Sequence, residues 1–484
     1  MPNPNTTPAG TLYWHDYETF GTDPQREHPA QFAGIRTDEE LNIIGEPLVI
    51  YCRPANDFLP NPQACLVTGI TPQNARQQGL IEAEFIRRIQ KEMAQPNTCT
   101  TGYNNIRFDD EFTRNTLYRN FYDPYAREWQ NGNSRWDILD LLRVTHALRP
   151  EGITWPKRDD GQTSFRLEKL TEANHISHES AHNALSDVIA TIEVAKLVKN
   201  TQPRLYQYVY EHRFKYRIQE LFDRYKQTPL IHISGMYSAQ KGHIGIVIPV
   251  AVDARNKNTV IVYELHHDPK ALLKMDAEQI KYFTFTSKDD LAEGEQRLPL
   301  KTIHINKCPV VVPLNTLTPE AIKQWQIDLP ICKKNLETLL SDQSLSERIQ
   351  SAFQTEYTDT SNDPDLQLYS GGFFSPADQA RMQQIRQSSI EELDSLQFNF
   401  DDPRLDEMFF RYRCRNYPDT LLLNELQRWD EYRIQRITAP EGSASIKLDQ
   451  YQQELEELKK QYADNDKVMS ILDQLQQYPA EIGL

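Results

Sequence analysis

The sequence predicts a mixed α/β protein whose first domain is a β-sheet flanked by helices. Strand-like runs alternate with helical patterns over residues 1–200, and short β-branched runs recur between residues 229 and 311. Helical periodicity dominates residues 365–484. At 484 residues the chain is too long for one ordinary core, and this length favours roughly three domains.

The first domain is predicted from apolar and aromatic runs that end in Pro, Gly and Asp turns, and from apolar residues spaced three and four apart. Its last helix begins near Ala184 and continues to Lys199, after which Thr201-Gln202-Pro203 indicates a boundary. The predicted strands are residues 11–20, 31–38, 47–53 and 98–104, and the predicted helices are residues 71–79, 82–94, 108–120 and 184–199.

The second domain is predicted to be a small antiparallel β domain, and the third to be helical. Turn residues separate the β-branched runs of the second domain, and the polar stretch at residues 357–364 is typical of a linker. The predicted strands are residues 230–233, 244–252, 259–265 and 300–305, and the clearest helices are residues 452–462 and 467–478. We therefore predict domains at residues 1–201, 202–355 and 356–484.

The composition excludes several classes of protein. A net charge of −16 argues against coating of nucleic acid by bulk attraction, although a locally basic groove in an acidic enzyme can still hold a strand. No window approaches the ~20 apolar residues of a membrane span, and the polar start lacks a secretion signal. Six cysteines without a C-x-x-C pair predict reduced thiols. We expect a cytoplasmic protein without a membrane partner.

Four acidic residues, Asp16, Glu18, Asp109 and Asp187, carry the strongest chemical signal. Asp16 and Glu18 stand two apart on the first predicted strand, so both side chains point to one face of the sheet. Neighbouring carboxylates repel one another unless a cation lies between them, and hard divalent cations prefer oxygen ligands. Two such ions can clamp the attacking and leaving oxygens of a phosphoryl displacement. The pattern predicts a metal-dependent nuclease.

Asp109 and Asp110 open a predicted helix, and acidic residues at that position are also favoured by the helix dipole. Asn105 and Phe108 lie close to Asp109 in the sequence, and this combination favours a functional role for Asp109. We assign the capping role to Asp110.

The segment His178-Glu179-Ser180-Ala181-His182 matches the H-E-x-x-H signature of zinc proteases. That signature needs both histidines on one helical face, whereas residues 173–180 read as a loop before the helix, and no downstream histidine completes the longer signature. A histidine near a helix start with Asp187 five residues on is better suited to a site where His182 activates water and Asp187 binds a metal. We favour this interpretation over the zinc site.

Arginines alternate with aromatic residues between Arg107 and Arg149. For any single residue an amphipathic surface with aromatic core anchors is the slightly better explanation, but as a set they supply phosphate contacts and stacking rings for unpaired bases. Lys301–Lys307 and Arg411–Arg415 either extend such a groove or form ordinary solvated faces. The set comprises Arg114, Tyr118, Arg119, Tyr125, Trp129, Arg135, Trp136 and Arg143, with Arg166 as a further candidate near a scissile phosphate.

With these residues in view, the chain resembles the 3′-to-5′ exonucleases of the DEDDh type, which have an RNase H-like fold. Asp16 and Glu18 match the first motif of that superfamily, residues 105–109 the second and residues 182–187 the third, with a histidine as base. Residues 15–21, 102–111 and 304–309 narrow the resemblance to the bacterial exodeoxyribonuclease I family, and it extends over essentially the whole chain.

The resemblance implies an RNase H-like exonuclease domain, a small SH3-like β domain and a C-terminal helical domain around a groove for single-stranded DNA. It implies processive release of 5′-mononucleotides from the 3′ end of single-stranded DNA, in DNA repair and recombination. The implied cofactor is Mg2+, with two ions per active site and Mn2+ as an alternative. The implied partner is the acidic C-terminal tail of single-stranded DNA-binding protein, and we expect a monomer.

The resemblance also implies roles for single residues. Asp16, Glu18, Asp109 and Asp187 would bind the metal ions, and His182 would deprotonate the attacking water. Glu18 and Arg166 would contact the substrate near the scissile phosphate. Further strand contacts are expected at Arg114, Tyr125, Trp129, Arg143, Asn258, Lys301, Asn306 and Tyr369. Arg149 matches one position of the partner pocket, whereas Gln227-Thr228-Pro229 lacks the lysine that related sequences carry there.

Two other functions stay open at this point. A DEDDh ribonuclease that trims RNA 3′ ends would share the acidic motifs, but such minimal enzymes resemble only the first domain and leave residues 201–484 unexplained. A noncatalytic adaptor that binds single strands would retain binding without releasing nucleotides.

Overall fold

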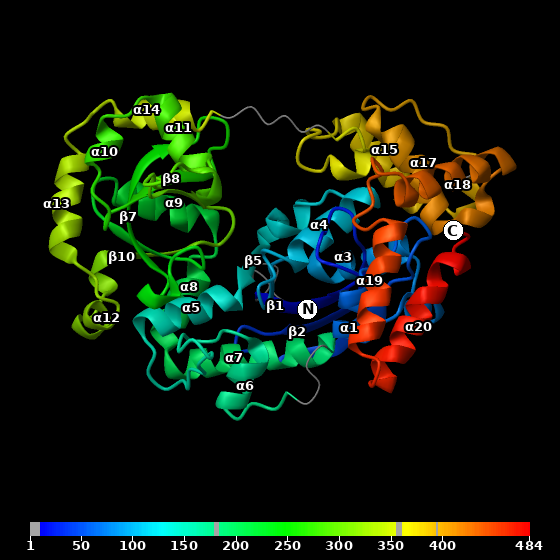
Figure 1. Ribbon diagram of the computed structural model, residues 1–484, viewed down its shortest axis with the longest axis horizontal. Helices are drawn as coiled ribbons and strands as arrows, with labels where there is room; N and C mark the ends of the chain where they lie inside the picture. The colour runs from blue at the N-terminus through cyan, green and yellow to red at the C-terminus, as the bar shows by residue number, and fades with distance from the viewer. Residues whose placement is uncertain (1–9, 179–182, 355–360, 394) are drawn as a thin grey trace, which may run out of the picture. The chain divides into compact units, whose positions relative to one another are not determined.

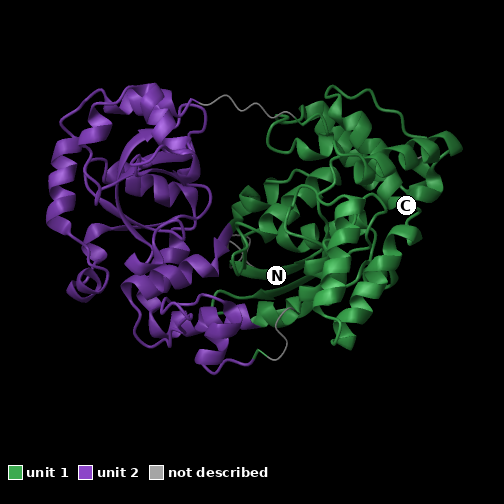
Figure 2. Ribbon diagram, viewed as in Figure 1, with its two compact units in different colours: residues 1–134, 178–189, 358–484 green, residues 135–177, 190–357 purple. Residues whose placement is uncertain are grey.

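The structure, a computed structural model, describes residues 10–178, 183–354, 361–393 and 395–484. It divides into two compact units, and each is formed by segments that are distant in the sequence (Figures 1 and 2). Unit 1 comprises residues 1–134, 178–189 and 358–484, and unit 2 comprises residues 135–177 and 190–357. Most of the predicted first domain and almost all of the third therefore share one unit. The domain boundaries at 201 and 355 stay predictions.

A five-stranded sheet with the order β3-β2-β1-β4-β5 confirms the predicted α/β class. β1 runs antiparallel to β2, with Asp16 opposite Ala33, and parallel to β4, where the last paired residue of β1 is Trp14. Asp16 and Glu18 therefore lie beyond the end of the β1–β4 pairing. The strands are β1 (Thr11–Thr19), β2 (Pro29–Thr37), β3 (Ile43–Tyr51), β4 (Thr98–Gly102) and β5 (Ser134–Asp137).

Alternation along β1 separates the core from the carboxylates. Tyr13 and Tyr17 pack with Phe32 of β2 and with apolar residues of α3 (Glu82–Met93) and α4 (Asp109–Arg119). Because successive side chains of a strand point to opposite faces, Asp16 and Glu18 project to the side away from this core. The hydrophobic pattern of β1 thus decides where its acidic side chains lie.

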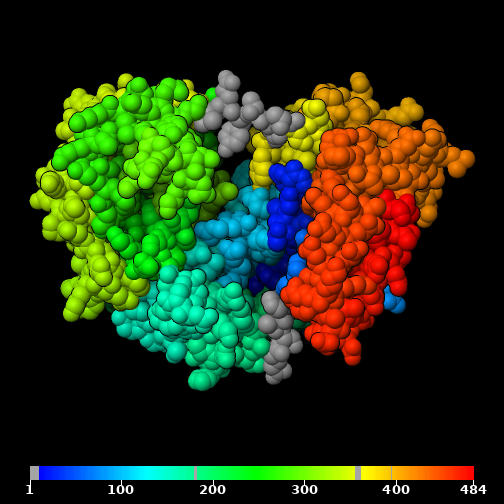
Figure 3. Space-filling model, viewed as in Figure 1, coloured from blue at the N-terminus to red at the C-terminus, as the bar shows by residue number. Residues whose placement is uncertain are grey.

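The C-terminal helices cover another part of unit 1. Phe20 and Phe58, from the N-terminal part of the chain, are buried with Tyr451, Leu472 and Tyr478. In the space-filling view, the orange and red C-terminal residues lie directly against the blue N-terminal ones (Figure 3). The helices concerned are α1 (Pro62–Thr68), α2 (Pro72–Gln78), α18 (Leu423–Thr438), α19 (Leu448–Gln461) and α20 (Asp466–Glu481).

Both interpretations of Arg411–Arg415, as an extension of a strand-binding groove and as an ordinary solvated face, are wrong. These residues belong to α17 (Arg404–Asn416), and their guanidinium groups are buried in ion pairs. Arg415 binds both Asp57 and Asp365, with N–O distances of 2.8 and 2.6 Å. Removing three arginines from water requires carboxylate partners, and this part of α17 therefore holds unit 1 together. The remaining helices of this part are α15 (Pro376–Gln387) and α16 (Ile390–Leu393).

Unit 2 contains the predicted antiparallel β domain, a five-stranded sheet with the order β10-β6-β7-β8-β9. Its four neighbouring strand pairs among the described residues are all antiparallel, and its core includes Val247, Val262, Ile303 and Val311. The short strand β10 was not predicted, because its partner β6 lies far away in the sequence. The strands are β6 (Leu230–Ile233), β7 (Ile244–Val252), β8 (Thr259–Glu264), β9 (Leu300–His304) and β10 (Val310–Pro313).

Along the chain, helices precede, interrupt and follow the strands of this sheet. Several of the short helices were not predicted from the sequence. The helices outside unit 1 are α5 (Ile138–Leu148), α6 (Leu167–Ala173), α8 (Pro203–Glu211), α9 (Lys215–Arg224), α10 (Lys270–Leu273), α11 (Ala277–Phe285), α12 (Pro319–Gln324), α13 (Leu329–Leu339) and α14 (Leu345–Ala352). Helix α7 (Ala184–Thr201) begins in unit 1 and continues into unit 2. Across the described ranges, no helix combines the length and apolar character needed to cross a membrane.

Candidate active site

Three of the four predicted metal ligands meet in unit 1. One carboxylate oxygen each from Asp16, Glu18 and Asp187 lies within 4.8 Å of the others. Asp16 and Glu18 come from β1, two residues apart on one face, and Asp187 comes from the first turn of α7. The two-residue repeat of the strand places Asp16 and Glu18 on one face, and the start of α7 brings Asp187 next to them, although Asp16 and Asp187 are 171 positions apart in the sequence.

The electrostatics of this cluster favour a cation. Burial, followed by the charges of Asp109, Glu18 and Asp187, raises the pKa of Asp16 well above its ordinary value. Burial and the neighbouring Asp187 and Asp109 raise the pKa of Glu18 to about 8. The carboxylates thus resist simultaneous ionisation in the protein alone, and a divalent cation between them would remove that repulsion. The donor set fits such an ion, since it consists of oxygen ligands only.

Asp109, the fourth predicted ligand, is buried at the start of α4. Its Oδ1 accepts a hydrogen bond from the backbone amide of Tyr17 at 3.0 Å. Asp109 does not belong to the cluster of Asp16, Glu18 and Asp187 whose oxygens lie within 4.8 Å of one another. Its charge nevertheless raises the pKa values of Asp16 and Glu18. The close approach of this loop depends on Gly102, because a Cβ there would lie 2.6 Å from the carbonyl oxygen of His15.

The prediction that Asp110 serves mainly as a helix cap is wrong, because its side chain pairs with an arginine instead. Asp110 does lie in the first turn of α4, but its Oδ1 accepts a hydrogen bond from Arg127 Nη2 at 2.7 Å, and both side chains are fully buried. Arg127 also donates to Thr100 Oγ1 at 3.3 Å. A buried carboxylate is stabilised far more by a guanidinium than by a helix dipole, which explains the difference.

The histidines of the predicted third motif divide into two cases. His182, the predicted base, lies outside the described residues. His178 lies in the loop that precedes α7, as predicted, and its Nε2 is 2.5 Å from Asp187 Oδ1. Because His178 is not helical, the arrangement that a zinc-protease signature requires is absent at this residue.

Three predicted strand contacts form one cluster in unit 1. Arg114 donates to Tyr369 Oη at 3.3 Å, and its guanidinium lies 5.3 Å from the centre of the Tyr125 ring. Arg114 is buried, with 2.7 Å ion pairs to Glu111 and Glu128, so its charge is largely neutralised within the protein. Tyr369 is 53% exposed. The rings rather than the guanidinium therefore face solvent in this cluster.

Trp129, the fourth strand contact predicted in this unit, is 65% exposed and is free to stack on a base. By contrast, other members of the arginine and aromatic set are buried and do not line an open surface. Arg119 forms an ion pair with Glu82, and Arg135 donates to the carbonyl oxygen of Asn306. The buried members are Tyr118, Arg119, Arg135 and Trp136.

In unit 2, Asn258 and Asn306 lie at the same end of the β8–β9 pair. The amide of Ile305, the neighbour of Asn306, donates to the carbonyl oxygen of Asn258 at 2.8 Å, and Thr259 pairs with His304. Lys301, on β9, donates to the carbonyl oxygen of Met236 at 2.8 Å and lies 3.7 Å from the centre of the Tyr237 ring. The three predicted contacts in this domain thus come from the paired strands β8 and β9 and the residues next to their ends.

The other arginines predicted in unit 2 differ in exposure. Arg143 is bound to Asp140 at 2.7 Å, whereas Arg166 is exposed at the residue that precedes α6. Arg149, the predicted partner residue, ends α5 and donates to the carbonyl oxygen of Thr316 at 3.1 Å. Arg166 is therefore the one of these three that presents its side chain to solvent.

Sequence reasoning missed the residues that hold the carboxylates. His178 was considered only as a zinc ligand, and its contact with Asp187 carries no sequence signal. The hydroxyl of Thr113 donates to the carbonyl oxygen of Asp109 at 2.9 Å and lies 3.1 Å from the hydroxyl of Tyr17. The sequence shows only that a threonine follows Asp109 by four residues in a helix, a spacing at which its hydroxyl can bond to the carbonyl oxygen of Asp109.

Models of three protein families match consecutive parts of the chain. The model described as exonuclease matches residues 13–195, the exonuclease I SH3-like domain matches residues 213–355, and the exonuclease I C-terminal domain matches residues 362–482. These matches agree with the predicted order of an exonuclease domain, an SH3-like domain and a C-terminal domain.

Relatives match over nearly the full chain. Exodeoxyribonuclease I of Escherichia coli is 48% identical over 473 residues, which cover 98% of each chain. The structure of a moderately thermophilic exonuclease I from Methylocaldum szegediense has a TM-score of 0.94 and 48% identity, covering 98% of this chain and 100% of that one. E. coli exonuclease I in complex with a dA16 oligonucleotide has a TM-score of 0.93 and 47% identity, with the same coverage.

Two further structures are relevant to cofactors and partners. One is SSB/exonuclease I in complex with the inhibitor CFAM, with a TM-score of 0.90 and 46% identity, covering 98% of this chain and 100% of that one. The other is a zinc-ion-bound form of an E. coli exonuclease I–single-stranded DNA complex, with a TM-score of 0.92 and 47% identity, covering 98% and 99%. Sequence, domain order and fold thus agree along the whole chain, and the chain belongs to the exodeoxyribonuclease I family.

Proposed function

We propose that the chain is a 3′-to-5′ exonuclease that degrades single-stranded DNA processively to 5′-mononucleotides, in DNA repair and recombination. The observation that carries this proposal is the cluster of Asp16, Glu18 and Asp187 within 4.8 Å in a chain that is 48% identical to E. coli exodeoxyribonuclease I. The solved complexes of E. coli exonuclease I with a dA16 oligonucleotide and with single-stranded DNA support the choice of substrate.

The cofactor is a pair of divalent ions, Mg2+ or alternatively Mn2+. Asp16, Glu18 and Asp187 would hold them together with Asp109, which the amide of Tyr17 orients. When bound, the ions neutralise the developing charge on the attacking and leaving oxygens of the phosphodiester. The raised pKa of Glu18 supports this assignment, because the carboxylates repel one another in the protein alone.

The proton transfer falls to His182, whose imidazole accepts a proton from the attacking water. A histidine is suited to this step because its ordinary pKa lies near neutrality. His178 has a different role, since its Nε2 contacts Asp187 and restrains that carboxylate at the start of α7. Glu18 and the exposed Arg166 contact the substrate beside the scissile phosphate, where a guanidinium can bind two phosphate oxygens.

Upstream nucleotides are held by a combination of aromatic rings, asparagine amides and basic side chains. In unit 1 the contacts are Arg114, Tyr125, Trp129 and Tyr369, and in unit 2 they are Arg143, Asn258, Lys301 and Asn306. The exposure of Trp129 and Tyr369 supports stacking, which tolerates any base sequence. The net charge of −16 is consistent with such a strand path, because it discourages unspecific binding elsewhere.

We further propose that the protein is a cytoplasmic monomer that docks the acidic C-terminal tail of single-stranded DNA-binding protein. The SSB/exonuclease I structure supports this choice of partner. Arg149 contributes one cation to the docking pocket, and the loss of a lysine at Gln227-Thr228-Pro229 weakens it.

The proposal is tested with oligonucleotides labelled at the 3′ or the 5′ end, single-stranded or duplex, with Mg2+ and with EDTA. We expect the 3′ label to be released first, from single strands only, and only with metal. Faster degradation of single-stranded RNA would favour an RNA-trimming enzyme. Strand binding in EDTA without nucleotide release under any metal would identify an adaptor.

A further inference from the structure

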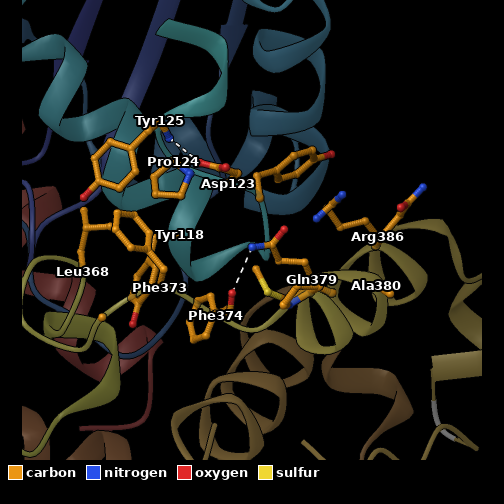
Figure 4. A pocket seen from close by; sticks show the side chains of 15 residues that line it. Tyr118, Asp123, Pro124, Tyr125, Leu368, Phe373, Phe374, Gln379, Ala380 and Arg386 are labelled. Atoms are coloured by element: carbon orange, nitrogen blue, oxygen red, sulfur yellow. Dashed lines mark hydrogen bonds between the residues drawn. The ribbon is translucent and has the colours of Figure 1, made fainter. Parts of the chain in front are cut away.

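Unit 1 contains a pocket of about 400 Å³ whose lining includes five aromatic rings, and of its lining residues the proposed function uses only Tyr125. One side is formed by Asp123, Pro124 and Tyr125, in the segment that follows α4, and the other side by residues 368–386 (Figure 4). The volume falls within the range typical of small-ligand sites. The rings in its lining belong to Tyr118, Tyr122, Tyr125, Phe373 and Phe374.

The floor of the pocket is fixed by packing and hydrogen bonds. Tyr118 and Phe374 stack with ring centres 5.9 Å apart, and the hydroxyl of Tyr118 donates to the carbonyl oxygen of Pro364 at 3.1 Å. Arg404 lies 4.6 Å from the centre of the Phe374 ring and donates to the carbonyl oxygen of Gly372. The floor is thus already ordered, so a ligand would not have to create it.

The rim carries an exposed phenylalanine. The side chain of Phe373 is 91% exposed, although its ring lies 6.3 Å from that of Tyr125 in an edge-on arrangement. The turn before it favours glycine, because Gly372 has a φ of +75°, a conformation that residues with a Cβ rarely adopt. Phe373 is not an isolated exposed residue, because Tyr125 contacts both it and the half-exposed ring of Tyr369, and a contiguous group of exposed rings indicates a contact surface.

Arg386, on α15, supplies the cation of the pocket. Its guanidinium lies 4.4 Å from the centre of the Tyr122 ring and donates to the carbonyl oxygen of Phe121. Within the described ranges it forms no ion pair, in contrast to Arg114, which two glutamates neutralise. An arginine stacked on a ring without a carboxylate partner is suited to a phosphate group.

The pocket continues the cluster of predicted strand contacts. Tyr125 belongs to both, and its ring lies 6.5 Å from Tyr369 and 6.3 Å from Phe373. A strand that stacks on Tyr369 and Tyr125 would therefore reach Phe373 with its next ring contact. Resting on the proposed function, we propose that this pocket binds an unstacked nucleobase of the single strand, with Phe373 and Tyr125 against the base and Arg386 at the adjoining phosphate.

The test uses strand binding in EDTA, where cleavage is blocked. A dT strand carries one 2-aminopurine, moved along it one position at a time, and its fluorescence reports stacking on protein rings. The variants are Phe373→Ala and, as a matched control, Leu423→Ala, which is 86% exposed at the start of α18 in the same unit and lies outside the pocket. Thermal unfolding checks that both variants fold.

We expect one position whose quenching is lost in Phe373→Ala and kept in Leu423→Ala. An abasic nucleotide at that position should weaken wild-type binding by about tenfold, which is typical of base–ring stacking, and should have no further effect on Phe373→Ala. Arg386→Gln should lower the slope of log affinity against log salt by about 1.

An unchanged quenching profile in Phe373→Ala would overturn the inference. So would binding of free dAMP that Phe373→Ala abolishes without changing the strand profile, because the pocket would then serve a free nucleotide. The proposed function is judged separately, by nucleotide release from wild-type protein in Mg2+. If the wild-type protein releases nucleotides but Phe373→Ala leaves the quenching profile unchanged, the base-binding role of the pocket is rejected and the proposed function is retained.

Discussion

The backbone amide of Tyr17 donates a hydrogen bond to Oδ1 of Asp109 at 3.0 Å. Tyr17 stands between Asp16 and Glu18, so this bond ties the first residue of α4 to the strand that carries two further carboxylates. Thr113 strengthens the link, because its hydroxyl contacts both the carbonyl oxygen of Asp109 and the hydroxyl of Tyr17. The spacing of the acidic site is therefore held by residues that bind no metal themselves.

Thr113→Val should weaken metal binding. Losing the hydroxyl frees the first turn of α4 from Tyr17, and outer contacts of this kind typically contribute roughly 10- to 100-fold in metal affinity. The concentration of Mn2+ at half-maximal rate and the rise in melting temperature with Mn2+ would both report the change. Thr116→Val is the control, since Thr116 is equally buried on α4 but accepts a hydrogen bond from Arg119. Equal effects of the two substitutions would point to general damage to the helix.

Asp16→Asn should abolish nucleotide release in Mg2+ while strand binding in EDTA is retained. The same substitution should raise the melting temperature of the metal-free protein, because it removes one of several carboxylates that repel one another. Both quantities are measurable on one preparation, by release of a 3′ label and by thermal unfolding in EDTA. Full activity of the variant would rule out Asp16 as a metal ligand.

His182→Ala should slow hydrolysis by roughly 10²- to 10⁴-fold, the usual contribution of a general base. The reaction should be followed in single turnover, so that product release does not mask the chemical step. His175→Asn is a suitable control, because His175 lies in the same segment with φ of +57°, a conformation that asparagine tolerates. A neutral-pH rate for His182→Ala equal to that of the control would remove His182 from the mechanism.

The stability of the metal-free protein should fall as pH rises from about 4.5 to 8. The native state keeps the proton of Glu18 up to its raised pKa of about 8, whereas the unfolded chain releases that proton near 4.5. The unfolded state then binds fewer protons, which lowers the free energy of unfolding by up to roughly 3–5 kcal/mol over this window. Urea unfolding at pH 6 and 8.5 in EDTA measures the decline, and Glu18→Gln should flatten it.

Saturating Mg2+ should abolish the same decline, because ionised carboxylates are the ligands and the metal lowers the pKa of Glu18. The stabilisation by metal should therefore be larger at pH 8.5 than at pH 6. Identical stabilisation at the two pH values would contradict the assignment of Glu18 to the metal site.

Asp57→Asn should destabilise unit 1 by about 3–5 kcal/mol, since it leaves the buried Arg436 without its carboxylate and removes one of the two carboxylates that pair with Arg415. Burial opposes the ionisation of Asp57, but Arg415 and Arg436 outweigh it and hold the pKa well below its ordinary value. This stabilisation is present above the unfolded pKa, near 4, and is lost as pH falls below it. Chemical denaturation of wild type and variant at pH 7 and pH 3 would show a difference that shrinks in acid.

Much of the fold follows from local sequence patterns. The period of two in β1 predicts both its core face and the shared face of Asp16 and Glu18, and the helical period predicts α7 with Asp187 in its first turn. The short strand β10 and the surroundings of Arg415 could not be predicted, because they depend on partners far away in the chain. An arginine run looks the same whether it faces a phosphate or a buried aspartate. Only the tertiary structure reveals the partner.

The joint core of Phe58 and Tyr478 has a consequence for biosynthesis. Roughly 400 residues separate the two, and synthesis proceeds at about 5–20 residues per second. The apolar face of the N-terminal segment therefore emerges from the ribosome roughly 20 seconds or more before the helices that cover it. A nascent chain exposes this face throughout that interval, which makes it a natural binding site for chaperones and a site of aggregation for chains that terminate early.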